Sequence, residues 1–95
     1  MTIREFQKAI EAIYLTKDRA RGIPANLAWL LEELGELAQA LRKGDVSEAE
    51  GEFADTLAWL CTIASLAGVD LENVAASKYA HGCPKCHRAP CCCAV

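Results

Sequence analysis

Two long amphipathic segments of this sequence are separated by only a few residues. The first opens at Pro24 or Ala25 and closes at Lys43-Gly44, where a basic last turn meets a glycine. The second begins at Ser47, which has the capping-box spacing with Glu50. Because so short a connection can join only neighbouring helices, it predicts an antiparallel helical hairpin.

The remainder of the first 80 residues also has helical patterning. Capping signals and apolar residues at three- and four-residue spacing predict helices over residues 2–21, from 24 or 25 to 43, over 47–67, and from 70 or 73 to 79. No stretch before residue 80 alternates apolar and polar residues like a strand. We therefore expect an all-α domain over residues 1–80, followed by a Cys-rich tail over residues 81–95.

The size of the chain suggests that it does not fold alone. A core made by 95 residues yields roughly 3–5 kcal/mol without a metal, a disulfide or a second subunit. We therefore expect a homo-oligomer. The formal net charge of −3 lacks the basic character that duplex nucleic acid or an anionic membrane surface attracts, so neither is an expected partner.

The N-terminus and the longest uncharged run bear on localisation. The first residues are charged and show no apolar secretory segment, which favours a cytoplasmic protein. The uncharged run from Thr56 to Val69 is shorter than the roughly 18 residues of a membrane span, and we interpret it as a buried core helix.

Four carboxylates are spaced to meet across the predicted hairpin. Glu33 and Glu36 lie three residues apart on one helix, and Glu52 and Asp55 do so on the next. An antiparallel pairing brings the two sets level. Repulsion within such a group is relieved by a cation, and an all-oxygen ligand set suits Mg²⁺ or Mn²⁺. The alternative is that each glutamate is simply a good helix former on a solvated face.

Two tryptophans strengthen the metal interpretation. Trp29 lies four residues before Glu33, and Trp59 lies four residues after Asp55, so the hairpin places both indoles at the same end of the acidic group. Solvated helix faces rarely carry tryptophan in line with their charges. We therefore expect these strips to be sheltered by another helix or subunit.

The segment Glu32-Glu33-Leu34-Gly35-Glu36, followed by Glu52-Phe53-Ala54-Asp55, resembles the EExxE and ExxD signature of MazG-like nucleoside triphosphate pyrophosphohydrolases. These belong to an all-α superfamily that includes dimeric dUTPases. The resemblance covers about residues 1–80. It implies a four-helix MazG-like fold completed by a homodimer or a dimer of dimers. It also implies Mg²⁺-dependent hydrolysis of a nucleoside triphosphate to the monophosphate and pyrophosphate.

The resemblance also assigns roles to particular residues. Matching the motif residue by residue gives four metal ligands, Glu33, Glu36, Glu52 and Asp55, and three catalytic candidates, Glu32, Glu33 and Glu36. Which carboxylate is the general base stays open. The candidates for substrate binding are Lys78, which fits the family's basic position on the fourth helix, Lys17 as a phosphate contact, and Trp29 for stacking on the base. The family usually carries an asparagine near this basic position, but residues 75–77 offer none at the expected spacing.

Two other functions fit the same residues. One is a non-catalytic helical dimer whose acidic group only holds a cation and whose Cys-rich tail docks a partner. The other is an enzyme of the same superfamily that acts on a single nucleotide, such as dUTP or dCTP.

The tail contains five of the six cysteines. Cys83 and Cys86 form a CxxC pair, and Cys91 and Cys93 follow closely, so these four could supply tetrahedral ligands to Zn²⁺. Disulfides or a loosely ordered thiol-rich tail are the alternatives. Cys61 lies in an apolar helix and is interpreted as a small buried residue.

Overall fold

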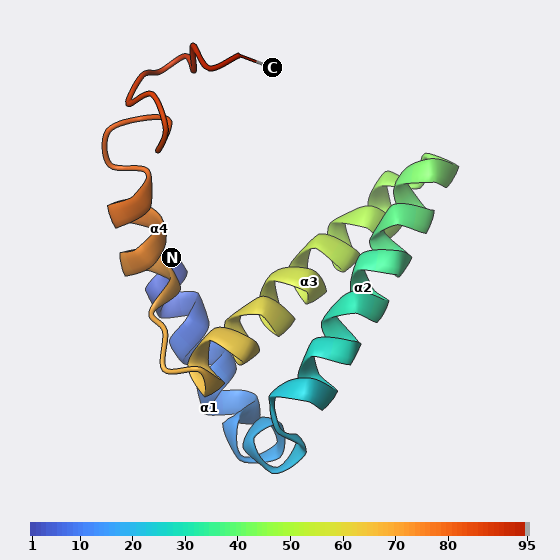
Figure 1. Ribbon diagram of the computed structural model, residues 1–95. Helices are drawn as coiled ribbons and strands as arrows, with labels where there is room; N and C mark the ends of the chain where they lie inside the picture. Colours follow the sequence, from blue (N-terminus) through green and yellow to red (C-terminus); the bar gives the residue numbers. More distant parts are fainter. Residues whose placement is uncertain (95) are drawn as a thin grey trace.

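The computed structural model describes residues 1–94, which form four α-helices and no strand (Figure 1). These are α1 (Ile3–Arg21), α2 (Ile23–Lys43), α3 (Val46–Leu66) and α4 (Leu71–Lys78). The all-α prediction is therefore confirmed. The last residue of the predicted tail, residue 95, lies outside the described residues.

The turn between α2 and α3 explains why the hairpin is so tight. Gly44 adopts a left-handed conformation with φ of 73°, and its N–H caps the carbonyls at the end of α2. The Asp45 side chain then accepts a hydrogen bond of 3.0 Å from the Glu48 N–H and begins α3. The prediction that Ser47 caps this helix is wrong, because Asp45 is the N-cap and Ser47 already lies within the helix.

Helices α2 and α3 lie side by side in opposite directions (Figure 1). Near the turn, Ala40 and Ala49 are buried, and their small side chains let the two backbones approach closely. At the far end of the pair, Trp29 stacks on Trp59 with ring centroids 5.9 Å apart and an interplanar angle of 9°. The prediction that the two indoles lie at the same end of the hairpin is thus confirmed.

A buried polar group ties α1 to this hairpin. Asn26 is fully buried, and its Nδ2 donates to the carbonyl oxygens of Asp18 and Gly22 at 2.8 and 2.9 Å. The Thr62 hydroxyl donates to the Asp18 carboxylate at 2.9 Å. These bonds fix the reversal from α1 into α2 against the middle of α3, since each satisfies a group that burial has removed from water.

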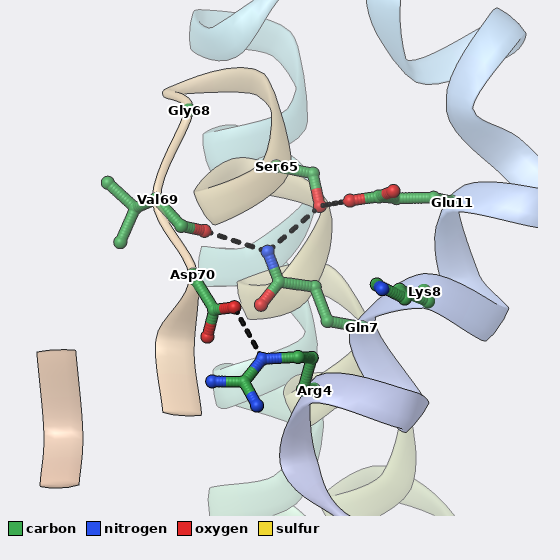
Figure 2. Close-up of a pocket in the computed structure, with 8 residues that line it drawn as sticks. All are labelled: Arg4, Gln7, Lys8, Glu11, Ser65, Gly68, Val69 and Asp70. Carbon is green, nitrogen blue, oxygen red and sulfur yellow. Dashed lines mark hydrogen bonds and ion pairs between the residues drawn. The ribbon is translucent and has the colours of Figure 1, made fainter. Parts of the chain in front are cut away.

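The first half of α1 holds the chain between α3 and α4 (Figure 2). Gln7 Nε2 donates to Ser65 Oγ and to the Val69 carbonyl, at 3.1 and 2.8 Å. Arg4 forms an ion pair of 2.7 Å with Asp70, the N-cap of α4, and this pair lowers the pKa of the Asp70 carboxyl. The small cavity of about 210 Å³ at this place is thus part of the anchoring of α4.

The chain is too extended to bury its own apolar residues. Its radius of gyration is 15.7 Å, whereas a compact domain of this length has one of about 12 Å. Along α2, Leu30 is buried, but Leu27, Leu31 and Leu41 are 43, 61 and 56% exposed. The prediction that residues 56–69 form a buried core helix is wrong for a single chain, because only one side of this segment is covered by α1 and α2.

In the described part of the chain, no single helix has the length and apolar character needed to cross a membrane. Helices α3 and α4 meet that criterion only when taken together, and they are bent by 97° relative to each other.

Candidate active site

Three of the four predicted metal ligands converge across the hairpin. Glu33 and Glu36 extend from one face of α2 because they are three residues apart, and Glu52 extends toward them from α3. One carboxylate oxygen from each residue lies within 4.8 Å of the others. We call these three residues the acidic cluster.

Two carboxylate oxygens of the acidic cluster are buried and have no hydrogen-bond donor in the described part of the chain. Glu33 Oε2 and Glu52 Oε2 are both shielded from solvent, and neither receives a hydrogen bond from residues 1–94. Interaction with the Glu33 carboxyl, then partial burial, then the charge of Glu36 raise the pKa of Glu52 to about 7. Near neutral pH the Glu52 carboxyl is therefore partly protonated, and this proton stands in for a counterion.

This donor set suits a hard divalent cation. Carboxylate oxygens are the preferred ligands of Mg²⁺ and Mn²⁺, which typically keep several waters and take one or two carboxylates from the protein. Buried oxygens without a donor cost free energy unless a cation or a proton satisfies them. The two shielded oxygens of the acidic cluster therefore fit a bound cation better than a hydrogen-bonded structural role.

Asp55, the fourth predicted ligand, lies beside the acidic cluster and not within it. It lies one helical turn further along α3 and lines a cavity of about 200 Å³ between α1 and α3. We call this the α1–α3 cavity. Lys17, a predicted phosphate contact, lines the same cavity. A ligand filling this cavity would therefore be within reach of both a carboxylate and an ammonium group.

An aromatic wall closes one side of the α1–α3 cavity. Trp59 lines the cavity, and Trp29, the predicted stacking residue, lies behind it in the indole stack. The guanidinium carbon of Arg21 is 5.8 Å from the ring centroid of Trp59, a cation–π geometry that leaves Arg21 at the cavity. Apolar ring faces and two basic groups thus share one opening.

Two of the predicted residues lie apart from these features. Glu32 is exposed on α2 and is not a member of the acidic cluster. Lys78 lies in the last turn of α4, which packs against α1, and it lines neither the acidic cluster nor the α1–α3 cavity in the single chain. Their roles stay predictions.

Sequence reasoning missed three residues that line the cavity, Tyr14, Asp18 and Thr62. A signal for two of them was available, because Tyr14, Asp18 and Arg21 follow Ile10 at the three- and four-residue spacing of one helix face. Asp18 is almost fully buried and is held by the hydroxyl of Thr62 and by Arg21, whose nearest nitrogen is 3.6 Å away. It therefore shapes the base of the cavity.

The four cysteines predicted as zinc ligands also come together. The Sγ atoms of four cysteines all lie within 4.8 Å of one another: Cys83, Cys86, Cys91 and Cys93. Cys61 is fully buried in α3, as expected for a small apolar side chain.

Fold and site together define an all-α protein whose helical hairpin presents carboxylates from both of its helices beside a basic, aromatic-walled cavity. Comparison with known families agrees with this class. The model of the MazG nucleotide pyrophosphohydrolase domain matches residues 21–87, and the chain belongs to this family. No curated protein is similar enough to the chain to be matched.

Proposed function

We propose that this protein hydrolyses nucleoside triphosphates to nucleoside monophosphates and pyrophosphate, with Mg²⁺ held by the acidic cluster. The reaction consumes one water, forms a bond from its oxygen to the α-phosphorus, and breaks the bond between that phosphorus and the oxygen bridging to the β-phosphate. The observation that carries the proposal is the convergence of Glu33, Glu36 and Glu52 in a chain of the MazG family.

The residues of the α1–α3 cavity suit a nucleotide. Lys17 and Arg21 are cations at the opening, where they favour the phosphate chain. The indole of Trp59 provides an aromatic face of the kind on which bases stack. Asp55 lines the same cavity and lies one helical turn along α3 from Glu52 of the acidic cluster. Phosphates held by the basic groups are therefore directed toward the carboxylates, which is the positioning that phosphoryl transfer requires.

The acidic cluster would supply two functions. A divalent cation bound there would neutralise charge on the phosphate oxygens. A carboxylate not engaged with the cation would orient the attacking water and accept its proton, and Glu32, Glu33 and Glu36 are the candidates for this role. A raised carboxyl pKa, such as that of Glu52, is typical of groups placed for proton transfer or cation binding.

A second copy of the chain is part of the proposal. Leu27, Leu31 and Leu41 leave a row of apolar side chains exposed along α2, and Leu57 and Leu60 do the same on α3. A homodimer, or a dimer of dimers, would cover these residues and supply the walls that one hairpin lacks. It would also let Lys78 of one subunit serve the site of another. We place this assembly in the cytoplasm.

The test is an assay of pyrophosphate release from a panel of ribo- and deoxyribonucleoside triphosphates, with Mg²⁺ and with a chelator. We expect activity only with the cation. Glu33→Gln should reduce kcat/KM by about 100-fold or more, whereas Glu50→Gln, an exposed residue on α3, should leave it unchanged. Lys17→Ala should raise KM, and Lys43→Ala is its control at the exposed end of α2.

The same panel distinguishes the alternatives. Activity on one nucleotide alone would indicate a specialised enzyme such as a dUTP or dCTP pyrophosphohydrolase. Inactivity on every nucleotide, together with a Glu36→Ala variant of unchanged cation affinity and stability, would refute both hydrolytic proposals. The remaining interpretation would then be a structural helical oligomer.

A further inference from the structure

After α4 the chain folds into a compact loop in which four thiols face one another. Cys83 Sγ lies 3.8 Å from Cys93 Sγ, and Cys86 Sγ lies 3.9 Å from Cys91 Sγ. All four sulfurs lie within 4.8 Å of one another. We call these four residues the thiol cluster. Its two halves come from either side of the segment 87–90.

The spacing of the thiol cluster matches a metal site better than disulfides. A tetrahedron with Zn–S bonds of about 2.3 Å has sulfur–sulfur edges of about 3.8 Å. A disulfide needs sulfurs about 2.05 Å apart. The closest pairs, at 3.8 and 3.9 Å, therefore lie at the edge length of a zinc tetrahedron, and all six cysteines are unbridged.

The backbone of the loop is shaped around these sulfurs. The His87 N–H donates to the Cys83 carbonyl at 2.7 Å, and the Cys83 N–H donates to the Arg88 carbonyl at 3.0 Å. Gly82 has φ of 89°, and a Cβ there would lie 2.8 Å from the backbone of Arg88. Only glycine permits this close approach, so the fold of the loop is specified independently of the thiols.

Two amide groups are directed at the sulfurs. The Cys92 N–H donates to Cys86 Sγ at 3.4 Å, and the Cys93 N–H donates to Cys91 Sγ at 3.3 Å. Hydrogen bonds from backbone N–H groups stabilise negative charge on ligating atoms and fix their orientation. These two donors favour the thiolate form, which is the form that binds a metal ion.

The donor chemistry selects the metal. The group of potential ligands contains four cysteines and excludes Cys92, the nearby His81 and His87, and every described carboxylate. Thiolates select soft or borderline ions and are poor ligands for Mg²⁺, so this site does not compete with the acidic cluster for its cation. Four ligands also leave no open coordination position, which is typical of a structural site.

We propose that Cys83, Cys86, Cys91 and Cys93 bind one structural Zn²⁺, which converts residues 82–93 into a small closed module at the end of the helical domain. All four cysteines bind as thiolates, so the thiol protons that remain at the working pH are released to solvent when the ion binds, and no redox step takes place. The bound ion carries a net charge of −2 with its four thiolates, which Lys85 and Arg88, on the same loop, partly offset.

The experiment is a metal analysis of untagged full-length protein purified without chelator. We expect about one zinc per chain in the unaltered protein and in Cys92→Ser, which changes a cysteine next to the cluster but outside it. Cys83→Ser and Cys91→Ser should each lose the zinc. Glu52→Gln, which alters the acidic cluster, should keep the zinc. The zinc proposal and the magnesium proposal can therefore fail independently.

A second measurement needs no variant. X-ray absorption of the zinc-loaded protein should show four sulfurs at about 2.3 Å, and Co²⁺ substitution should give the visible spectrum of a tetrahedral tetrathiolate site. The proposal is overturned by a chain that stays zinc-free with paired thiols, by iron in place of zinc, by nitrogen or oxygen ligands, or by equal zinc content in Cys83→Ser and Cys92→Ser. Helical content by circular dichroism checks that the variants fold.

Discussion

The affinity of the acidic cluster for a divalent cation should rise with pH through neutrality. In the cation-free protein the pKa of Glu52 is about 7, raised first by the Glu33 carboxyl. A cation binds only the ionised form, so it must displace this proton. From pH 6 to pH 8 the ionised fraction of Glu52 increases from about one tenth to about nine tenths. The apparent dissociation constant should therefore fall about 10-fold over that interval.

The assay is calorimetric titration of nucleotide-free protein with Mn²⁺ at pH 6, 7 and 8. Nucleotide is omitted because its terminal phosphate titrates in the same range. At pH 7 each bound ion should release about half a proton, measured by repeating the titration in buffers of different ionisation enthalpy.

Two results would refute this reasoning. One is an affinity that changes less than about twofold between pH 6 and pH 8, which would mean that Glu52 is ionised throughout. The other is a 10-fold pH dependence that persists in Glu52→Gln, which would assign the proton to a different group. Glu50→Gln, altered on the exposed face of the same helix, should titrate like the unaltered protein.

Three further predictions concern stability and zinc retention. Because the pKa of Glu52 is raised in the folded state, the cation-free protein should lose stability as pH rises from about 4.5 to 7. At pH 8 Glu52→Gln should therefore melt at a higher temperature than the unaltered protein. Saturating Mn²⁺ should abolish this difference. Asn26→Ala removes both hydrogen bonds of a fully buried side chain and should cost about 2–4 kcal/mol in urea unfolding. Gln39→Ala, on the exposed face of α2, should cost less than about 0.5 kcal/mol. Gly82→Ala forces a Cβ against the Arg88 backbone and should lower zinc retention against a chelator without changing helical content.

The features that sequence predicted best are those set by local spacing. Gly44 closes one helix and the next begins two residues later, so the hairpin follows from the chain itself. Once two helices are antiparallel, the positions of Trp29 and Trp59 relative to the turn fix their meeting. The same arithmetic places Glu36 level with Glu52, and these two residues do meet in the structure. Helical periodicity is sufficient for this because each step involves only neighbouring helices.

The features that sequence did not predict depend on contacts between distant helices. Nothing local to Asp18 indicates that Thr62 will donate to it, and nothing local to Asp55 indicates that it will face the α1–α3 cavity beside the acidic cluster. Leu31 and Leu41 lie at helical spacing on one apolar stripe of α2, but this spacing does not identify what covers the stripe. In the single chain both side chains are exposed to solvent. The spacing of residues on one helix carries no information about the surface of a partner.

The indole stack makes this protein its own optical reporter. The chain has two tryptophans, and both are in the stack of Trp29 on Trp59. All tryptophan emission therefore arises from a single place, one helical turn from Glu33 and from Asp55 and in contact with the α1–α3 cavity. Binding of a cation or a nucleotide, closure of the cavity, or arrival of a second subunit over the exposed face of Trp29 would each change that emission without any label having been introduced.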